Sequence, residues 1–164
     1  MNTEKQAEVT WESPPVGWLK VNVDGSFVPQ TGEAGIGVVI RDSNGAVILT
    51  AWKVLSRCAD AAEAEATACV EGFRLAAQWT REPVIIESDC VRIVQALHRR
   101  EDRSELSFLM AEAVEQAQVL SDWRVAQVRR ECNLIANELA HLARRNKHSA
   151  VWLGRAPACV ADLN

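Results

Sequence analysis

The segment WLKVNVDGS, residues 18–26, contains the first predicted strand and its most informative carboxylate. Leu19, Val21 and Val23 alternate with polar residues, and this period of two predicts a β-strand with one buried face. The strand ends at Asp24, next to Gly25-Ser26, where an aspartate most often serves only to complete a turn. Asp24 taken alone therefore indicates no particular chemistry.

Two more strands are predicted directly after this segment. Residues 35–40 (GIGVVI) and 46–52 (AVILTAW) flank Asp42-Ser43-Asn44-Gly45, and an Asn-Gly step between two such runs is typical of a β-hairpin. Because the connections are short, we expect the three strands to form an antiparallel meander.

Helices and strands alternate in the remainder of the chain. Residues 60–79 are rich in alanine and other helix formers, and Asp60 is suited to cap the start of this helix. Residues 84–88 (VIIES) predict a strand parallel to its neighbour, because a helical crossover precedes it; within it, Glu87 is expected at the surface. The order βββαβααβα is completed by helices over 89–99, 105–120 and 133–147 and by a strand over 123–128.

The composition indicates one domain without bulk affinity for nucleic acid. The chain has 164 residues, 48% of them hydrophobic, which suits one compact core. We expect a flexible N-terminal tail over 1–15, a domain over 16–148 and a C-terminal tail over 149–164. Because the net charge is -4 and the pI about 5.4, a nucleic-acid substrate has to be inferred from a specific site.

The cysteines and the hydrophobic pattern bear on the compartment. The five cysteines are scattered and include no CxxC pair, which argues against a zinc site and a disulfide framework and favours a reducing environment. No apolar run approaches the roughly 18 to 20 residues needed to cross a bilayer. We therefore expect a soluble, intracellular protein, and the sequence does not distinguish cytoplasm from nucleus.

Glu65 is the most unusual carboxylate of the sequence. Glu63 points about 160 degrees away on the same helix and is predicted to be solvated. Glu65 instead shares a helical face with small and apolar residues, namely Ala68, Cys69, Gly72, Phe73 and Ala76. A carboxylate on a packed face requires a cation, and no lysine or arginine lies within one turn of it on that face.

Asp89 follows the strand over 84–88, where it either caps the next helix or belongs to a site. Strand ends and an adjacent helix start can bring Asp24, Glu65 and Asp89 together. Three mutually repelling carboxylates require metal ions, and Mg²⁺ or Mn²⁺ suits such oxygen ligands. Two ions about 4 Å apart can activate a water and stabilise the leaving oxygen in phosphodiester hydrolysis.

Five short motifs around these residues resemble the plant-type ribonuclease H-like domains related to the ribonuclease H part of retroelement reverse transcriptases. In order they are VNVDGS (21–26), GIGVVIRD (35–42), AEATA (64–68), ESD (87–89) and RECNLIANELA (130–140). The resemblance covers about residues 17–145. It implies an α/β protein with the ribonuclease H-like fold, a five-stranded mixed sheet flanked by helices.

The resemblance also implies an activity and the residues that perform it. Asp24, Glu65 and Asp89 would be catalytic ligands of two Mg²⁺ or Mn²⁺ ions, and Asn137 occupies the family's fourth acidic position. An asparagine oxygen can coordinate a hard cation but brings no charge, so the second ion should bind more weakly. The expected reaction is endonucleolytic hydrolysis of the RNA strand of an RNA–DNA hybrid, leaving a 3′-hydroxyl and a 5′-phosphate. The expected substrate contacts are Gly25, Ser26, Gly35 and Arg130.

Departures from the family pattern leave other functions open. Residues 124–137 lack the histidine that many cellular ribonucleases H carry before the last helix, and the histidines elsewhere are predicted at the surface of helices: His98, His141 and His148. The place of a basic insertion found in some members holds only Arg99, Arg100 and Arg103. The alternatives are an inactive nucleic-acid-binding module and a protein-interaction domain whose partners the sequence does not identify.

Overall fold

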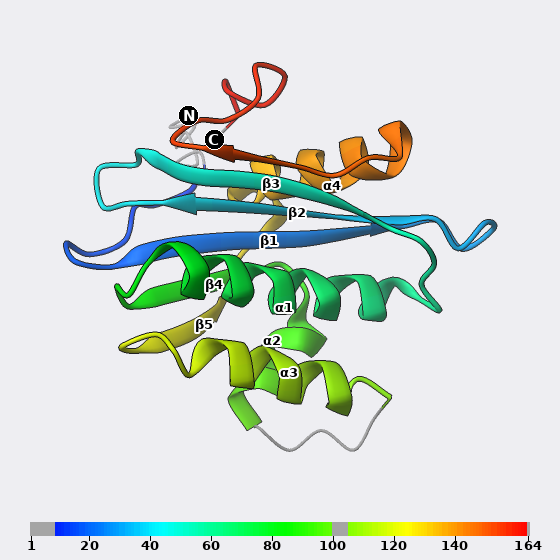
Figure 1. Ribbon diagram of the computed structural model, residues 1–164, viewed down its shortest axis with the longest axis horizontal. Coiled ribbons are helices and arrows are strands. Elements are labelled where there is room, and N and C mark those ends of the chain that lie inside the picture. The colour runs from blue at the N-terminus through cyan, green and yellow to red at the C-terminus, as the bar shows by residue number, and fades with distance from the viewer. Residues whose placement is uncertain (1–8, 100–104, 164) are drawn as a thin grey trace, which may run out of the picture.

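A mixed β-sheet of six strands forms the centre of the computed structural model, which describes residues 9–99 and 105–163 (Figure 1). The strands lie in the order β5-β4-β1-β2-β3-β6. The meander β1–β2–β3 is antiparallel, and β4 is parallel to both β1 and β5, as the helical crossovers predict. Their bounds are β1 (Leu19–Phe27), β2 (Ala34–Arg41), β3 (Val47–Leu55), β4 (Val84–Ser88), β5 (Trp123–Gln127) and β6 (Ala150–Leu153).

The prediction of five strands is wrong by one, because β6 adds an antiparallel edge strand beside β3. Part of the stretch 149–164, predicted as a tail, therefore belongs to the sheet. Trp152 of β6 packs edge-on against Trp52 of β3, with ring centroids 4.6 Å apart. This contact helps to hold a strand of only four residues, which is too short to leave a clear alternation in the sequence.

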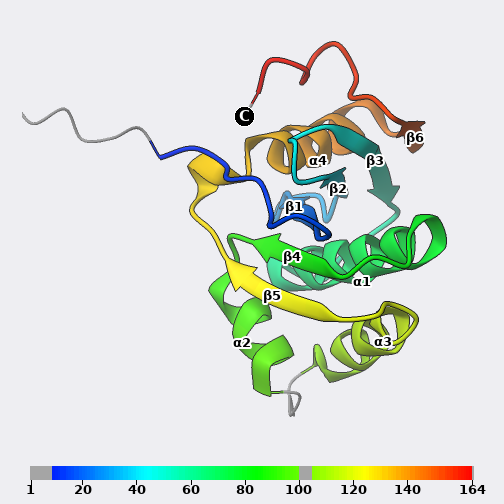
Figure 2. The same ribbon diagram turned by 90° about the vertical axis from the view of Figure 1, so that its left-hand side faces the viewer.

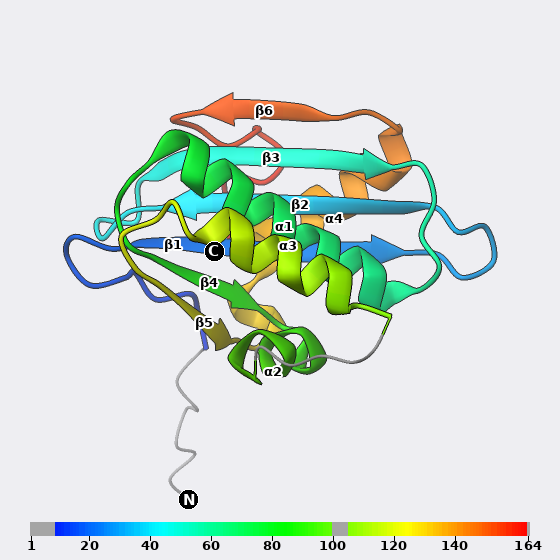
Figure 3. The same cartoon turned by 60° about the horizontal axis from the view of Figure 1, so that its bottom comes forward.

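Helices cover both faces of the sheet (Figure 2). One face carries α1, α2 and α3, whose apolar side chains share a core with β1 and β4, and Figure 3 shows α1 and α3 lying across it. The other face carries α4, which packs with β3 and the C-terminal segment. The bounds are α1 (Ala61–Trp79), α2 (Val91–Arg99), α3 (Ser107–Ala117), the short 3-10 helix η1 (Arg130–Cys132) and α4 (Leu134–Asn146).

The cap predicted for α1 is confirmed. Asp60 precedes the helix in an extended conformation, and its Oδ1 accepts a hydrogen bond of 2.8 Å from the amide of Glu63. This bond satisfies one of the free amides of the first turn and fixes where the helix begins. Glu65 therefore lies in the second turn, close to the end of β1.

Two glycines of β2 let α4 approach the sheet closely. A Cβ at Gly37 would lie 2.2 Å from the carbonyl oxygen of Ala136, and one at Gly35 would lie 2.5 Å from that of Ala140. No larger side chain fits at either position without moving the helix. The close packing holds α4 at a fixed height above β1 and β2.

The N-terminal segment before β1 is attached to the sheet in its described part. The predicted tail spans 1–15, of which residues 1–8 lie outside the described residues. Trp11 donates an indole hydrogen bond of 3.0 Å to Asn22 Oδ1, and its ring lies 3.7 Å from the guanidinium carbon of Arg41. Arg41 is buried, and burial lowers its pKa to about 10. Trp11 thus covers a buried cation.

Among the helices of 9–99 and 105–163, none combines the length and the apolar character needed to cross a bilayer.

Candidate active site

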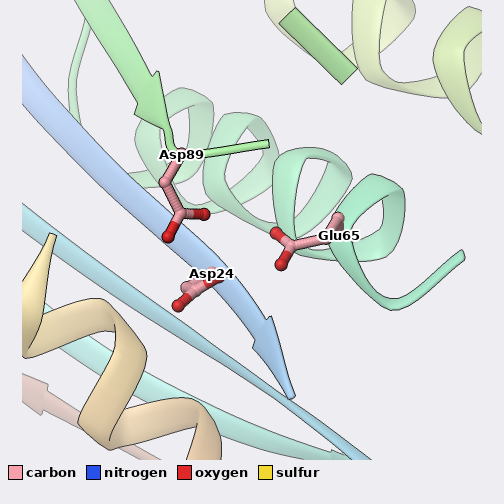
Figure 4. A group of neighbouring side chains, drawn as sticks. All are labelled: Asp24, Glu65 and Asp89. Carbon is pink, nitrogen blue, oxygen red and sulfur yellow. The ribbon is translucent and has the colours of Figure 1, made fainter. Parts of the chain in front are cut away.

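Three carboxylates meet where β1, α1 and the end of β4 converge (Figure 4). Asp24 lies in β1 and Glu65 in α1, and Asp89 is the residue directly after β4. One ligand oxygen from each lies within 4.8 Å of the other two. The structure therefore brings together the three acidic residues that the sequence selected.

The sheet register explains how Asp89 reaches Asp24. Strand β4 runs parallel to β1, with Glu87 opposite Asn22, and it ends at Ser88. The chain leaves the sheet at the next residue, beside the second half of β1. Asp24 is thus flanked by the end of a strand rather than by a paired neighbour on that side.

Gly25 explains how Glu65 reaches Asp24. A Cβ at this position would lie 2.7 Å from the carbonyl carbon of Ala64 and 2.9 Å from the amide nitrogen of Glu65, so only glycine lets α1 come this close. The amide of Gly25 donates to Asp24 Oδ1 at 3.0 Å and to Glu65 Oε2 at 3.3 Å. One backbone amide therefore holds two carboxylates beside each other. Gly25, predicted as a substrate contact, lies inside this arrangement.

Burial and mutual repulsion in the acidic cluster raise the pKa values of Glu65 and Asp89. Burial, followed by repulsion from Asp24, raises the pKa of Glu65 to about 11. Burial and Asp24 also raise the pKa of Asp89 to about 6, against the opposing charge of Arg130. In the described part of the chain no lysine or arginine forms an ion pair with any of the three. A cation would therefore be stabilised strongly at this position.

Asn137 lies against the same group from the opposite side. It occupies the first half of α4, and its Nδ2 donates a hydrogen bond of 2.7 Å to Asp24 Oδ2. The amide thus presents its nitrogen, rather than its oxygen, to the carboxylate. To offer an oxygen to a cation the side chain would have to turn its amide by half a rotation.

The other predicted substrate contacts lie in different environments. Arg130 is exposed in η1 and close enough to Asp89 to affect its pKa. Ser26 is buried and hydrogen-bonded to residues of α4. Gly35 is buried in the interior of the sheet under α4, between Ser26 of β1 and Val54 of β3. The expected substrate contact at Gly35 is therefore wrong, since α4 covers this residue and its close fit explains why it is glycine.

A buried polar network next to the carboxylates was not predicted. Asn22 Nδ2 donates to Glu87 Oε1 and to Asn133 Oδ1, each at 3.1 Å, and Asn133 Nδ2 donates to the carbonyl of Val23 at 2.9 Å. These bonds join the start of α4 to the residue before Asp24. The alternation of β1 placed Asn22 on the face of Asp24, and this was the only signal for the network.

Glu87 corrects the prediction of a surface residue. Only 4% of it is exposed, and it pairs with the ammonium of Lys20 at 3.2 Å. The carboxylate is enclosed because β5 extends the sheet beyond β4 and Asn22 donates a hydrogen bond to it.

The histidines are engaged more than their predicted surface positions suggest. His98 bonds the carbonyl of Val125 at 2.9 Å, and His141 bonds Ser26 at 3.2 Å. His148 was predicted on a helix, yet α4 ends at Asn146 with Lys147 in a left-handed conformation, so His148 lies in the loop before β6. There its Nδ1 accepts a hydrogen bond from the indole of Trp52.

Solved structures with the same architecture include ribonucleases H. The RNase H1 of the halophilic archaeon Halobacterium salinarum superimposes with a TM-score of 0.74 at 22% identity, covering 79% of this chain and 99% of that one. LC11-RNase H1, isolated from compost and solved with an RNA/DNA hybrid, gives a TM-score of 0.70 at 20% identity, covering 79% and 98%. The fold is therefore the ribonuclease H-like fold.

The sequence comparisons define the family more narrowly. Residues 22–143 match the reverse transcriptase-like family. A protein of Arabidopsis thaliana, provisionally named a ribonuclease H protein, is 36% identical over 138 residues, which are 82% of this chain and 22% of that protein. The chain thus spans about a fifth of the length of this relative. It belongs to the reverse transcriptase-like family and is a plant-type ribonuclease H-like domain.

Proposed function

We propose that this domain hydrolyses the RNA strand of RNA–DNA hybrids in a reaction that depends on divalent cations. The observation that carries the proposal is the convergence of Asp24, Glu65 and Asp89, with ligand oxygens within 4.8 Å of one another. The family and the ribonuclease H structures that share the fold support this reaction over other uses of an acidic site.

The donor set fits hard divalent cations. All three groups offer carboxylate oxygens, which are the ligands that Mg²⁺ and Mn²⁺ prefer. Burial and Asp24 raise the pKa of Glu65, so the ionised form of this carboxylate is unfavourable unless positive charge is added. Two cations would supply that charge. When bound, such ions activate a water and stabilise the charge on the leaving oxygen. Asp24, Glu65 and Asp89 would hold them, and Asn137 would complete the set only through its amide oxygen.

The protein's own groups position this site. The Gly25 amide fixes the carboxylates of Asp24 and Glu65 side by side. The network of Asn22 and Asn133 ties the start of α4 to β1, so Asn137 stays against Asp24. Arg130, exposed beside Asp89, carries a charge suited to a phosphate of the substrate.

Cleavage of a labelled hybrid tests the proposal, with duplex DNA and duplex RNA of the same sequence as controls. We expect the hybrid alone to be cut by the wild type in Mg²⁺ or Mn²⁺, with products that carry a 5′-phosphate. EDTA and the substitution Asp24→Asn should each abolish the products. Equal cleavage by Asp24→Asn, or no cleavage of the hybrid in either metal, would contradict the proposal.

A second function is a nucleic-acid-binding module that has lost turnover. Asn137 favours it, because its amide donates to Asp24 at the position of the family's fourth acid. This module would bind the hybrid in an anisotropy assay and leave it intact in Mg²⁺ and Mn²⁺. Absence of binding would exclude it.

A further inference from the structure

A cluster of three polar side chains lies on the same face of the sheet as Asp24, outside the carboxylate group. Ser26 comes from β1, and His141 and Arg144 come from α4. Ser26 Oγ lies 3.2 Å from His141 Nδ1 and accepts a hydrogen bond of 3.0 Å from Arg144 Nε. Arg144 Nη2 lies 3.4 Å from the same His141 nitrogen. The three side chains hold one another in place.

The hydrogen bonds determine which groups of the cluster remain available. With Ser26 and Arg144 as donors to Nδ1, the imidazole is neutral and carries its proton on Nε2. Burial, and then the charge of Arg144, lower the pKa of His141 and favour this neutral form. The imidazole Nε2 proton and part of the guanidinium are left to donate to a ligand.

Arg144 differs from its neighbours because no carboxylate neutralises it within the described chain. Arg145 pairs with Glu138 at 2.9 Å and Lys147 with Glu33 at 3.6 Å, whereas Arg144 contacts Ser26 and His141. A half-buried guanidinium held by neutral partners attracts an anion, and its planar fork suits phosphate oxygens.

The position of Arg144 is open to a ligand. It lines a surface cavity of about 290 Å³ where β2 begins and β3 ends, together with Lys147 and Glu33. Ser26 and Asp24 are two residues apart on one strand, which is about 6.6 Å. The cluster and the carboxylates therefore share one strand of the sheet, close enough for both to contact the same nucleic-acid strand.

We propose that Ser26, His141 and Arg144 form a subsite for a backbone phosphate of the strand that is cut, near the bond hydrolysed. This inference rests on the proposed function for the identity of the strand. Arg144 supplies the charge, and Ser26 and His141 hold its guanidinium against β1.

The salt dependence of hybrid binding tests the subsite. Fluorescence anisotropy in EDTA gives the affinity at several KCl concentrations for the wild type, Arg144→Gln and Arg144→Lys. The matched control is Arg145→Gln, which removes an equal charge from the next residue of the same helix. Thermal unfolding of each variant verifies that it is folded.

We expect Arg144→Gln to weaken binding and to lower the slope of log K against log salt by about 1, the loss of one phosphate contact. Arg144→Lys should keep the slope, since the charge remains, and Arg145→Gln should match the wild type. Equal slopes for Arg144→Gln and Arg145→Gln, with a wild type that binds, would overturn the subsite and leave the proposed function intact.

Two further outcomes distinguish a nucleic-acid phosphate from free phosphate, and failure of the subsite from failure of the proposed function. Titration with inorganic phosphate, followed by the imidazole signals of His141 in NMR spectra, should cause no saturable shift at millimolar concentration. A saturable shift, with an unchanged salt slope for hybrid, would assign the cluster to a small anion instead. A wild type without affinity for hybrid would overturn the subsite, while the cleavage assay in Mg²⁺ judges the proposed function separately.

Discussion

The substitution Asn137→Asp reverses the role of the residue that faces Asp24. In the wild type the Asn137 amide donates to the Asp24 carboxylate at 2.7 Å, whereas an aspartate would place a second carboxylate oxygen there. A hydrogen bond to a charged group contributes about 1.5 to 3 kcal/mol. For a domain of 150 to 250 residues each kcal/mol shifts Tm by about 2 to 4 °C, so the metal-free variant should melt about 3 to 12 °C lower.

Divalent cations should reverse this loss. The variant offers a fourth carboxylate to the cluster of Asp24, Glu65 and Asp89, so it should bind Mg²⁺ and Mn²⁺ more tightly than the wild type. Because a ligand that binds only the folded state raises stability, its Tm should rise more steeply with metal concentration.

Thermal unfolding with and without metal checks the prediction, and Asn137→Ala is the matched control. The alanine variant loses the hydrogen bond to Asp24 but gains no ligand, so it should melt lower in EDTA and stay lower in Mg²⁺. An Asn137→Asp protein as stable as the wild type in EDTA, or one that gains no more from Mg²⁺ than Asn137→Ala, would refute the reasoning.

Three further predictions concern the surroundings of the site. The folded-state pKa of Glu65 is raised to about 11 from its ordinary 4.5, so the metal-free protein should lose stability as pH rises above about 5. Glu65→Gln should reduce this loss in melting curves recorded in EDTA from pH 5 to 8. A decline as steep in Glu65→Gln as in the wild type would contradict it. Gly25→Ala would place a methyl group 2.7 Å from the backbone of Ala64. Denaturant unfolding should show a free energy of unfolding lower by about 1 to 3 kcal/mol, and calorimetry a weaker Mn²⁺ affinity. An unchanged affinity would mean that this close approach does not position the site. Trp11→Ala removes the ring that covers Arg41 and should lower the free energy of unfolding by about 1 to 3 kcal/mol in the same assay. An unchanged free energy of unfolding would show that the N-terminal segment does not stabilise the domain.

The parts of the fold with strong local signals were predicted correctly. The helix Ala61–Trp79 begins directly after the predicted cap, and the strand Val84–Ser88 has the bounds that its apolar run indicated. Asp24, Glu65 and Asp89 could be brought together from sequence because strand ends and a carboxylate on a packed helical face are local patterns.

The missed features depend on contacts between distant segments. Strand β6 is four residues long and is held by pairing with β3, which no local pattern contains. Burial of Glu87 depends on Lys20 and Asn22, which lie 65 or more residues earlier. Gly35 was expected to contact substrate, yet the approach of α4, about a hundred residues later, is what requires it to be glycine.

Hybrid cleavage by Glu65→Gln and Glu63→Gln tests the central claim most directly. Both substitutions replace a carboxyl group of the same helix with an amide, but Glu65 lies among the carboxylates, whereas the Glu63 side chain accepts a hydrogen bond from the amide of Ala59. We predict that Glu65→Gln cleaves the hybrid at least about 100-fold more slowly in Mg²⁺, as expected for a lost metal ligand, and that Glu63→Gln retains the wild-type rate. Equal rates for the two variants, or an inactive wild type, would contradict the claim that these three carboxylates form the active site of a ribonuclease H.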